Sequence, residues 1–340
     1  NSKKKILQHK IRVFCRLRPM NRNEAGQGGT AFVEKIDDYS VSVETPRGLR
    51  EFQFDKVFGA EASQDEVFQD TSLIQSVIDG YNVCIFAYGQ TGSGKTFTMV
   101  GDKDQRNPGI MPRSFNAIFD ITRENSSKFE FKVSAYMLEL YNDRLQDLFV
   151  SQAAEAQAQT QPSSQTRRVE IKRTRKGVVF AQGAETKEAS SAQELYALFQ
   201  QACANRHIAA TMNVESSRSH LIIVIMVESR NLTNGSISTG KLSLVDLAGS
   251  ERAAKTGAKD HQLKANSINK SLSALGDVIS ALSADLPHVP YRNSKLTQYA
   301  TRVKAITNNA QRNVESKEIA QLKEVIMKLK SGLTVDDGDV

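Results

Sequence analysis

One segment of the chain has the residue types and spacing of a nucleotide phosphate site. It satisfies the pattern G-x-x-x-x-G-K-[ST] with Gly89, Gln90, Thr91, Gly92, Ser93, Gly94, Lys95 and Thr96. Glycines let backbone N–H groups converge on phosphate oxygens, and the helix expected to follow adds a favourable dipole. We expect Lys95 to reach the β- and γ-phosphates and Thr96 to be a ligand of Mg²⁺. A glycine-rich turn with an incidental lysine is the alternative, and the flanking strand and helix patterns disfavour it.

A carboxylate at the end of an apolar run is suited to the second half of such a site. Asp246 follows the run 242–245 and precedes Leu-Ala-Gly. An aspartate at the tip of a buried strand can hold Mg²⁺ through water, although many such residues only cap the next turn. The upstream phosphate motif favours the metal role.

The segment 213–220, NVESSRSH, is dense in hydroxyl groups. Hydroxyls there suit a γ-phosphate sensor that contacts Mg²⁺ and the attacking water, with Arg218 as a charged partner. A polar loop without function has the same composition, so spacing alone leaves both interpretations open.

Hydrophobic periodicity predicts the scaffold that must position these segments. Alternating or continuous apolar runs predict strands at 11–17, 32–36, 41–44, 52–58, 82–88, 129–140, 221–229 and 241–247. Helical spacing predicts helices at 65–78, 115–124, 190–205, 267–282 and 315–330. The run 82–88 is nearly all apolar, which is typical of a strand buried on both faces.

Composition excludes several classes of protein. The chain has 340 residues, of which 39% are hydrophobic and 24% charged, so it can form a large core and is not wholly disordered. Its longest apolar runs, 83–88 and 221–227, are far shorter than the roughly 20 residues that span a bilayer. Three scattered cysteines predict neither a disulfide framework nor a metal site, and favour a reducing, cytosolic compartment. A net charge of +7 mildly favours a polyanionic partner.

Two adjacent segments interrupt the periodic pattern. The low-complexity stretch 151–166 predicts a surface loop inside a domain. The basic stretch 167–176 is either a solvated flank of that loop or part of a partner-binding surface.

Five motifs in order resemble the kinesin motor domain family. They are RLRP at 16–19, FAYGQTGSGKTFTM at 86–99, NVESSRSH at 213–220, DLAGSE at 246–251, and SINKSLSALGDVI with HVPYRNSKLT at 267–279 and 288–297. The resemblance covers most of residues 9–306. It implies an α/β P-loop NTPase fold of the kinesin motor type, with a mixed, mainly parallel central sheet and helices on both faces. It also implies a microtubule-stimulated ATPase that uses ATP and Mg²⁺.

The resemblance implies a role for each matching residue. Arg16, Arg18 and Pro19 are expected to pack against adenine. Thr96 and Ser217 are expected near Mg²⁺, with Asp246 behind a water molecule.

Two of the motifs, NVESSRSH at 213–220 and DLAGSE at 246–251, resemble the two switch segments of the family, which are expected to carry the catalytic residues. Gly249 senses the γ-phosphate through its backbone N–H, and Arg218 and Glu251 form a salt bridge that closes the switches. Ser216 and Glu251 are the candidate relays to the attacking water. Catalysis then rests on positioning and electrostatics.

The same resemblance implies a microtubule-binding face, which is expected to meet acidic tubulin. Its candidate residues are Lys270, His288, Tyr291, Arg292 and Lys295. A nucleic-acid interpretation of the positive charge is disfavoured, because no nucleic-acid-binding module accompanies it.

The ends of the chain resemble the minus-end-directed, C-terminal-motor subfamily. Residues 1–10 read as the end of a coiled-coil neck that could support a homodimer, 11–308 as the motor domain, and 309–340 as a regulatory helix with an acidic tail. The seam of that helix consists of Ile319, Leu322, Val325, Ile326 and Leu329. A basic amphipathic helix of this kind is typical of a target of calmodulin or a related EF-hand protein, and a short coiled-coil or packing helix is the alternative. The expected location is the cytoplasm, on the microtubule cytoskeleton.

The chain departs from the family pattern in one large respect. Gln298 runs directly into Tyr299, where kinesins have the rest of a helix, a central strand and the start of the last helix. Smaller gaps fall after Thr211 and Lys264. Losing a central strand exposes two strand edges. A non-catalytic microtubule- or calmodulin-binding module on a degraded motor fold is therefore the alternative to an active motor.

Overall fold

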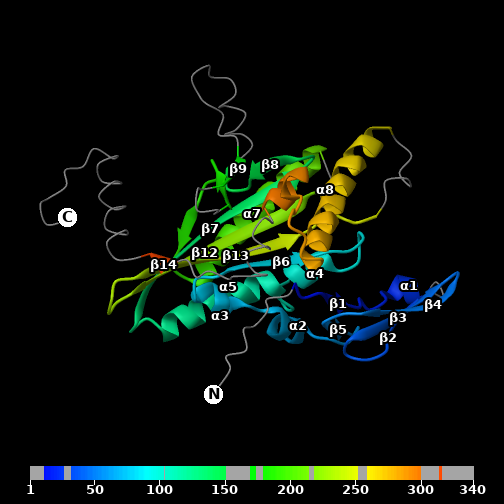
Figure 1. Cartoon of the computed structure of the whole chain (residues 1–340), viewed down its shortest axis with the longest axis horizontal. Helices are drawn as coiled ribbons and strands as arrows, with labels where there is room; N and C mark the ends of the chain where they lie inside the picture. Colours follow the sequence, from blue (N-terminus) through cyan, green and yellow to red (C-terminus); the bar gives the residue numbers. More distant parts are fainter. Residues whose placement is uncertain are drawn as a thin grey trace, which may run out of the picture.

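The computed structural model describes residues 11–26, 32–102, 104–150, 169–173, 179–213, 218–251, 259–299 and 314–315. The expectations for 1–10, for 151–168 and for the C-terminal helix lie outside these residues. At the centre is a seven-stranded sheet (Figure 1), whose strand path is β11 (Lys187–Ala189), β7 (Phe129–Tyr141), β12 (His220–Asn231), β13 (Ile237–Asp246) and β14 (Val314–Glu315). Beside that path, β6 (Asn82–Ala87) pairs with β13 and β8 (Arg144–Asp147) pairs with β7.

The sheet is mixed, as expected, but the expectation of mainly parallel pairing is wrong for the described residues. Only the β6–β13 pair of this sheet is parallel. For the β7–β8 and β12–β13 pairs the reason is local connection. Asn142 and Asp143 join β7 to β8 with φ of 47° and 57°, and a short turn closed by Gly235 N to Asn231 O (2.8 Å) joins β12 to β13. Tight turns of this kind connect antiparallel strands only.

Helices cover both faces of the sheet, and the alternation along β12 shows how. Ile223 and Ile225 face a core shared with α3 (Ile74–Ile78), α5 (Ile110–Glu124) and α7 (Ala192–Asn213). Ile222 and Val224 face the opposite core, shared with α8 (Lys259–Ser283) and α9 (Lys295–Tyr299). Because side chains alternate along a strand, a continuous apolar run is buried on both faces. Among the described helices, none is long and apolar enough to cross a membrane.

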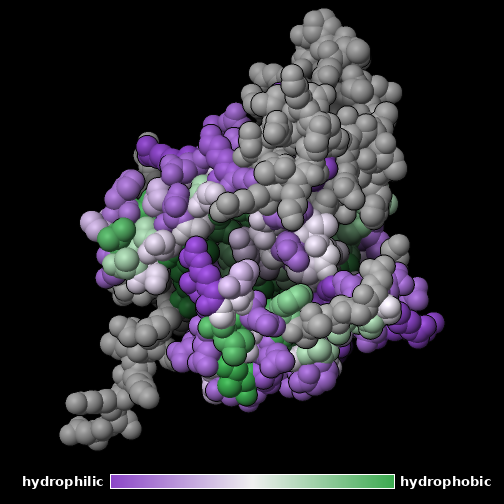
Figure 2. Space-filling view, turned by 90° about the vertical axis from the view of Figure 1, so that its right-hand side faces the viewer, coloured by the Kyte–Doolittle hydropathy of each residue, from purple (hydrophilic) through white to green (hydrophobic). Residues whose placement is uncertain are grey.

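A small lobe lies at one end of the molecule. It contains α1 (Arg22–Gly26), the three-stranded sheet β2 (Val33–Lys35), β3 (Ser40–Thr45) and β4 (Gly48–Gln53), and the parallel pair β1 (Phe14–Arg16) and β5 (Lys56–Phe58). The single strand predicted at 52–58 is therefore two strands in different sheets. Figure 2 looks onto this end, where hydrophobic patches lie among hydrophilic residues; Leu49 is 75% exposed.

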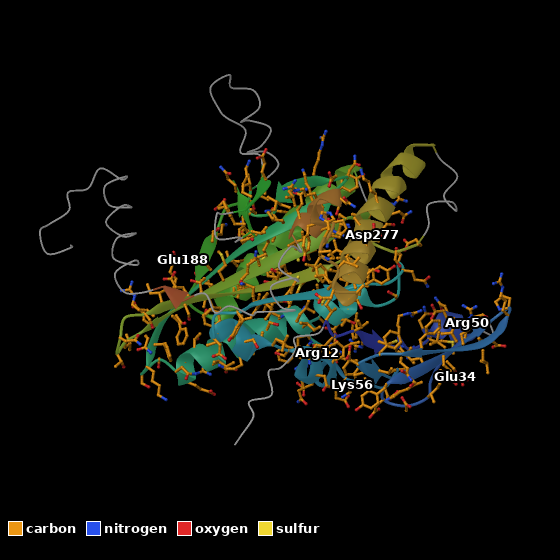
Figure 3. All side chains as sticks on the ribbon, in the orientation of Figure 1. Arg12, Glu34, Arg50, Lys56, Glu188 and Asp277 are labelled. Atoms are coloured by element: carbon orange, nitrogen blue, oxygen red, sulfur yellow. The ribbon has the colours of Figure 1, made fainter. Side chains whose placement is uncertain are left out.

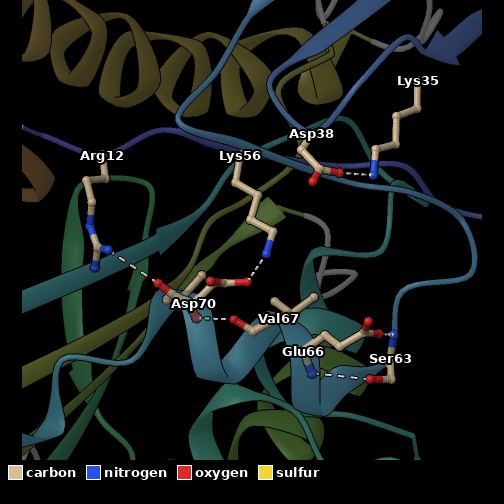
Figure 4. Close-up of polar contacts among 9 residues, drawn as sticks. Arg12, Lys35, Asp38, Lys56, Ser63, Glu66, Val67 and Asp70 are labelled. Carbon is tan, nitrogen blue, oxygen red and sulfur yellow. Dashed lines mark hydrogen bonds and ion pairs between the residues drawn. The ribbon is translucent and has the colours of Figure 1, made fainter.

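The helix predicted at 65–78 is also two elements, α2 (Gln64–Thr71) and α3, because Ser72 adopts an extended ψ of 134°. A capping box starts α2: Glu66 N donates to Ser63 Oγ (3.2 Å) and Ser63 N donates to Glu66 Oε2 (2.7 Å). At its other end, Asp70 pairs with Lys56 of β5 (Figure 4). This ion pair joins α2 to the small lobe.

One edge of β6 has no partner strand in the described part of the chain. The strand pairs with β13 alone, and Val83 is its only fully buried residue. The strand packs on both faces as predicted, since Ile85 and Ala87 contact one core and Cys84 and Phe86 contact the other, but all of its residues except Val83 are only half-buried. This open edge lies in the strand that leads into the phosphate motif.

Two further strands form a separate sheet. They are β9 (Glu170–Arg173) and β10 (Val179–Gln182), which form an antiparallel pair. Part of the basic stretch 167–176 thus lies in β9.

Candidate nucleotide site

The phosphate motif forms the turn between β6 and the short helix α4 (Lys95–Met99). Gly92 and Gly94 have φ of 79° and 93°, a left-handed conformation that favours glycine. Their backbone therefore curls tightly before the helix. The predicted order of strand, glycine-rich turn and helix is confirmed.

Backbone contacts bring the end of β13 to this turn. Leu247 N donates to Ala87 O (3.3 Å), and Ser250 N donates to Gly89 O (3.0 Å). Since β6 and β13 are parallel, their carboxyl ends meet at one sheet edge. Residues separated by about half of the chain thus meet beside the phosphate motif.

Thr96 and Asp246 are in direct contact at this edge. Thr96 Oγ1 donates to Asp246 Oδ2 over 2.6 Å, while Asp246 Oδ1 is buried without a hydrogen-bond partner. Burial raises the pKa of Asp246, against the opposing effect of the Thr96 hydrogen bond. A hydroxyl and an unsatisfied carboxylate oxygen fit Mg²⁺, which prefers oxygen ligands and keeps several waters. The described residues contain no cluster of three His, Cys, Asp or Glu residues, so protein carboxylates alone do not build a metal cage there.

Lys95 lies over the phosphate loop. Its Nζ donates to Gln90 O (2.9 Å). Burial lowers the pKa of Lys95, while attraction to Asp246 and Glu251 opposes that change. The ammonium is thus held within the loop at which a phosphate would bind.

Glu251 contacts the phosphate loop. Its carboxylate accepts hydrogen bonds from Thr91 N (2.8 Å) and from Thr91 Oγ1. Burial acts to raise the pKa of Glu251, but these hydrogen bonds dominate and lower it. Gly249 lies beneath this contact, where a Cβ would be 2.4 Å from Thr91 Oγ1. The salt bridge expected between Arg218 and Glu251 stays a prediction.

The three residues expected at the adenine are placed differently from one another. Arg18 lies beside the loop, since its Cδ is 3.8 Å from the position of a Cβ on Gly94. Pro19 is exposed next to it. Arg16 instead donates to Gln64 Oε1 (2.7 Å) and Thr98 Oγ1 (3.0 Å), so it joins β1 to α2 and to the end of α4.

Phe97 has no assigned role in the sequence-based interpretation. Its ring is 41% exposed on α4, and the Arg16 guanidinium carbon lies 5.4 Å from the ring centroid. An aromatic residue directly after the GKT triplet is the signal in the sequence that could have identified it. The ring offers a flat surface for a base.

The expected microtubule contacts come from three neighbouring elements. Lys270 is exposed on α8, and His288 and Arg292 are exposed before and within the 3-10 helix η3 (Tyr291–Asn293). Tyr291 is half-buried against the end of α8, and Lys295 is half-buried at the start of α9. The structure thus groups these elements on the α8 side of the sheet. Ser216 and Ser217 lie outside the described residues.

His220 is a further polar residue that the sequence interpretation left without a role. It is 2% exposed, at the start of β12. Its Nδ1 accepts from Ala248 N (3.0 Å) and its Nε2 lies 2.9 Å from Ser271 Oγ. The signal in the sequence is a histidine between a hydroxyl-rich segment and an entirely apolar run.

Comparison with known proteins agrees with this geometry. Residues 16–303 match the family described as the kinesin motor domain. The chain belongs to this kinesin family. The motor domain is 42% identical over 357 residues to the kinesin-like protein KIN-14E of Arabidopsis thaliana, covering 94% of this chain and 27% of that protein. It is 43% identical over 373 residues to KIN-14I of Oryza sativa subsp. japonica, covering 98% of this chain and 29% of that protein.

Two solved motor structures share the fold. The structure of a fast kinesin aligns with a TM-score of 0.77 at 34% identity, covering 90% of this chain and 94% of that one. The motor domain of the Kar3-like kinesin from Ashbya gossypii aligns with a TM-score of 0.70 at 31% identity, covering 89% and 90%. The α/β kinesin motor fold is thereby confirmed.

The chain spans less than a third of the length of these two plant relatives. The two alignments, over 357 and 373 residues, are longer than the 340-residue chain itself. The relatives therefore contain residues that have no counterpart here.

Proposed function

We propose that this motor domain binds Mg·ATP at the turn between β6 and α4 and hydrolyses it. The observation that carries the proposal is the Thr96–Asp246 contact, with the buried Asp246 Oδ1 available beside it. Lys95 neutralises phosphate charge from within the loop, and the Gly249 backbone approaches from the other side. When bound, Mg²⁺ supplies charge that stabilises the departing phosphate. Glu251 orients the attacking water after leaving Thr91.

Steady-state ATPase activity with and without microtubules tests this function. The chain should hydrolyse ATP slowly alone and faster with microtubules. Lys95→Ala should abolish nucleotide binding. Normal ATP affinity in that variant would show that the phosphates of ATP do not bind at this turn.

The proposed partner is the microtubule, contacted by Lys270, His288, Tyr291, Arg292 and Lys295. Relatives named KIN-14 and Kar3-like support assignment to the minus-end-directed group. Gliding of polarity-marked microtubules, driven by the chain fixed to a surface, tests direction. Gliding with plus ends leading supports minus-end movement, and the reverse contradicts it.

We further propose that residues 309–340 regulate the motor domain of residues 11–308. The apolar seam from Ile319 to Leu329 and its surrounding lysines support binding of a Ca²⁺-loaded EF-hand protein of the calmodulin type. Deleting residues 316–340 should abolish inhibition of microtubule binding by Ca²⁺-calmodulin. Persistent inhibition would place the regulatory element elsewhere. A neck before residue 11 would make the molecule a homodimer on cytoplasmic microtubules.

The second candidate is a non-catalytic microtubule-binding module. The open edge of β6 favours it, because a strand without its neighbour holds the phosphate loop less rigidly. Microtubule binding without ATP turnover would select this candidate.

A further inference from the structure

A buried imidazole lies between three elements of the motor domain. His220 begins β12, Ala248 follows β13 by two residues, and Ser271 lies on α8. Figure 1 shows α8 crossing the sheet next to β13 and β6. His220 hydrogen-bonds to both of the other residues, at 3.0 and 2.9 Å.

The backbone partner determines the tautomer of this histidine. The Ala248 amide can only donate, so Nδ1 must be unprotonated. In a neutral ring the proton is then on Nε2, which donates to Ser271 Oγ. Burial and the nearby Arg206 charge keep the ring neutral, lowering the pKa of His220 to about 4.

Ser219, the residue before His220, is also held by hydrogen bonds. Ser219 Oγ donates to Glu139 Oε1 (2.5 Å), and Arg206 Nε donates to the same oxygen (3.0 Å). These groups are almost fully buried. The imidazole therefore projects from a fixed base toward the two elements it contacts.

The two residues that His220 contacts lie beside the two proposed sites, the nucleotide site and the microtubule-binding face. Ala248 immediately precedes Gly249, which lies against Thr91 and Glu251 of the nucleotide site. Ser271 is next to Lys270, an exposed candidate microtubule contact. The direct polar path from one site to the other is two hydrogen bonds long.

We propose that His220 is a positioning residue that couples α8 to the Ala248–Gly249 backbone, so that microtubule contact at α8 changes the nucleotide site. The inference rests on the proposed microtubule-stimulated ATPase. Apolar contacts between α8 and the sheet resist separation in all directions, whereas these hydrogen bonds have a defined direction. A shift of α8 is thereby transmitted to the backbone N–H of Ala248, the residue before Gly249.

Two substitutions interrupt the path at the α8 side only. Ser271→Ala removes the hydroxyl, and His220→Asn keeps an acceptor near the Nδ1 position but is too short to reach Ser271. Each should lower the ratio of microtubule-stimulated to basal ATPase about fivefold, as expected for one buried hydrogen bond. Basal turnover and Mg·ATP affinity should stay within about twofold of the unsubstituted chain. Because both cut one path, the double variant should be no worse than either single one.

Two controls separate coupling from general stability. Ser273→Ala changes an exposed serine on the same helix and should leave the ratio unchanged. His220→Gln places its amide near the Nε2 position, so it reaches Ser271 and leaves the Ala248 amide unpaired. Hydrogen exchange at Ala248 should then accelerate in His220→Gln and remain slow in His220→Asn and Ser271→Ala.

The inference is overturned if Ser271→Ala and His220→Asn keep full stimulation, or if they reduce basal and stimulated rates equally. Additive losses in the double variant would also contradict a shared path. If microtubules fail to stimulate the unsubstituted chain, the proposed function itself is wrong, and the inference is overturned with it. The rate of the unsubstituted chain therefore distinguishes the two failures.

Discussion

At the scale of single residues, the strongest test concerns the carboxylate that meets Thr96. Asp246→Asn keeps the size of the side chain and removes the charge, so ligand oxygens for Mg²⁺ are weakened. We expect turnover to fall about 100-fold, with nucleotide binding becoming insensitive to Mg²⁺. Affinity for a fluorescent ATP analogue, measured with Mg²⁺ and with EDTA, checks this. The control is Asp120→Asn, which changes an exposed carboxylate on α5 and should have no effect.

His220 makes a second residue-level prediction, on stability against pH. Its pKa is lowered to about 4 in the folded chain, so between about pH 4 and 6.5 the unfolded chain binds the additional proton. The stabilising contribution is therefore complete above pH 6.5 and is lost as the pH falls toward 4, with a total of about 3 kcal/mol. Urea unfolding at a series of pH values, compared between the unsubstituted chain and His220→Gln, isolates this contribution. Equal pH slopes for the two proteins would contradict a buried neutral imidazole.

Much of the nucleotide site could be predicted at this scale, because short motifs encode local geometry. The glycines and Lys95 lie within one turn, and strand-end placement together with the upstream phosphate motif was enough to associate Asp246 with Thr96. The partner of Glu251 was not predictable in the same way. Thr91 is 160 positions away, and which hydrogen-bond donor the carboxylate selects depends on how the two loops meet. Arg16 likewise contacts Gln64, a partner that no motif indicates.

At the scale of elements, the contact between α3 and β13 requires a glycine. A Cβ on Gly240 would lie 1.8 Å from Val77 O, a backbone atom that cannot rotate away. We expect Gly240→Ala to destabilise the chain by about 2 kcal/mol or more, because α3 must move off the sheet. Gly276→Ala is the matched control on α8, where nothing lies within 4 Å of the new methyl group. It should be neutral or stabilise by up to about 1 kcal/mol. Urea midpoints measure both, and equal shifts would contradict the close approach.

The positions of most helices and strands could be predicted from hydrophobic periodicity. The pairing of the strands and the breaks within predicted elements could not. The apolar alternation of 129–140 and the continuous apolar run within 221–229 identified β7 and β12 almost to their ends. The division of 65–78 into α2 and α3 depends on Ser72 leaving the helical conformation, which the apolar spacing on either side conceals. The number of parallel pairs is a property of connections, and the open edge of β6 is a property of the sheet order, which the apolar run of the strand does not encode.

At the scale of the whole molecule, two exposed regions compete for the role of docking face. The small lobe has exposed apolar and charged residues, including Arg50 on β4. The α8, η3 and α9 region carries the candidate microtubule contacts. Figure 3 shows Arg50 in the lobe and Asp277 on α8, at separate parts of the molecule. The net charge of the chain cannot distinguish the two regions. A cation far from the docking face adds to the overall attraction to an acidic partner, as a cation within that face does.

A pair of charge reversals separates local contact from overall attraction. Arg292→Glu and Arg50→Glu change net charge equally, and both side chains are exposed. We expect Arg292→Glu to raise the microtubule concentration for half-maximal ATPase about tenfold at low salt, because an acidic surface then faces a carboxylate. Arg50→Glu should change it less than twofold. The difference should shrink as ionic strength rises and the Debye length falls below about 8 Å. Equal effects of the two reversals would mean that net charge attracts the motor domain and that the α8 side is not the docking face.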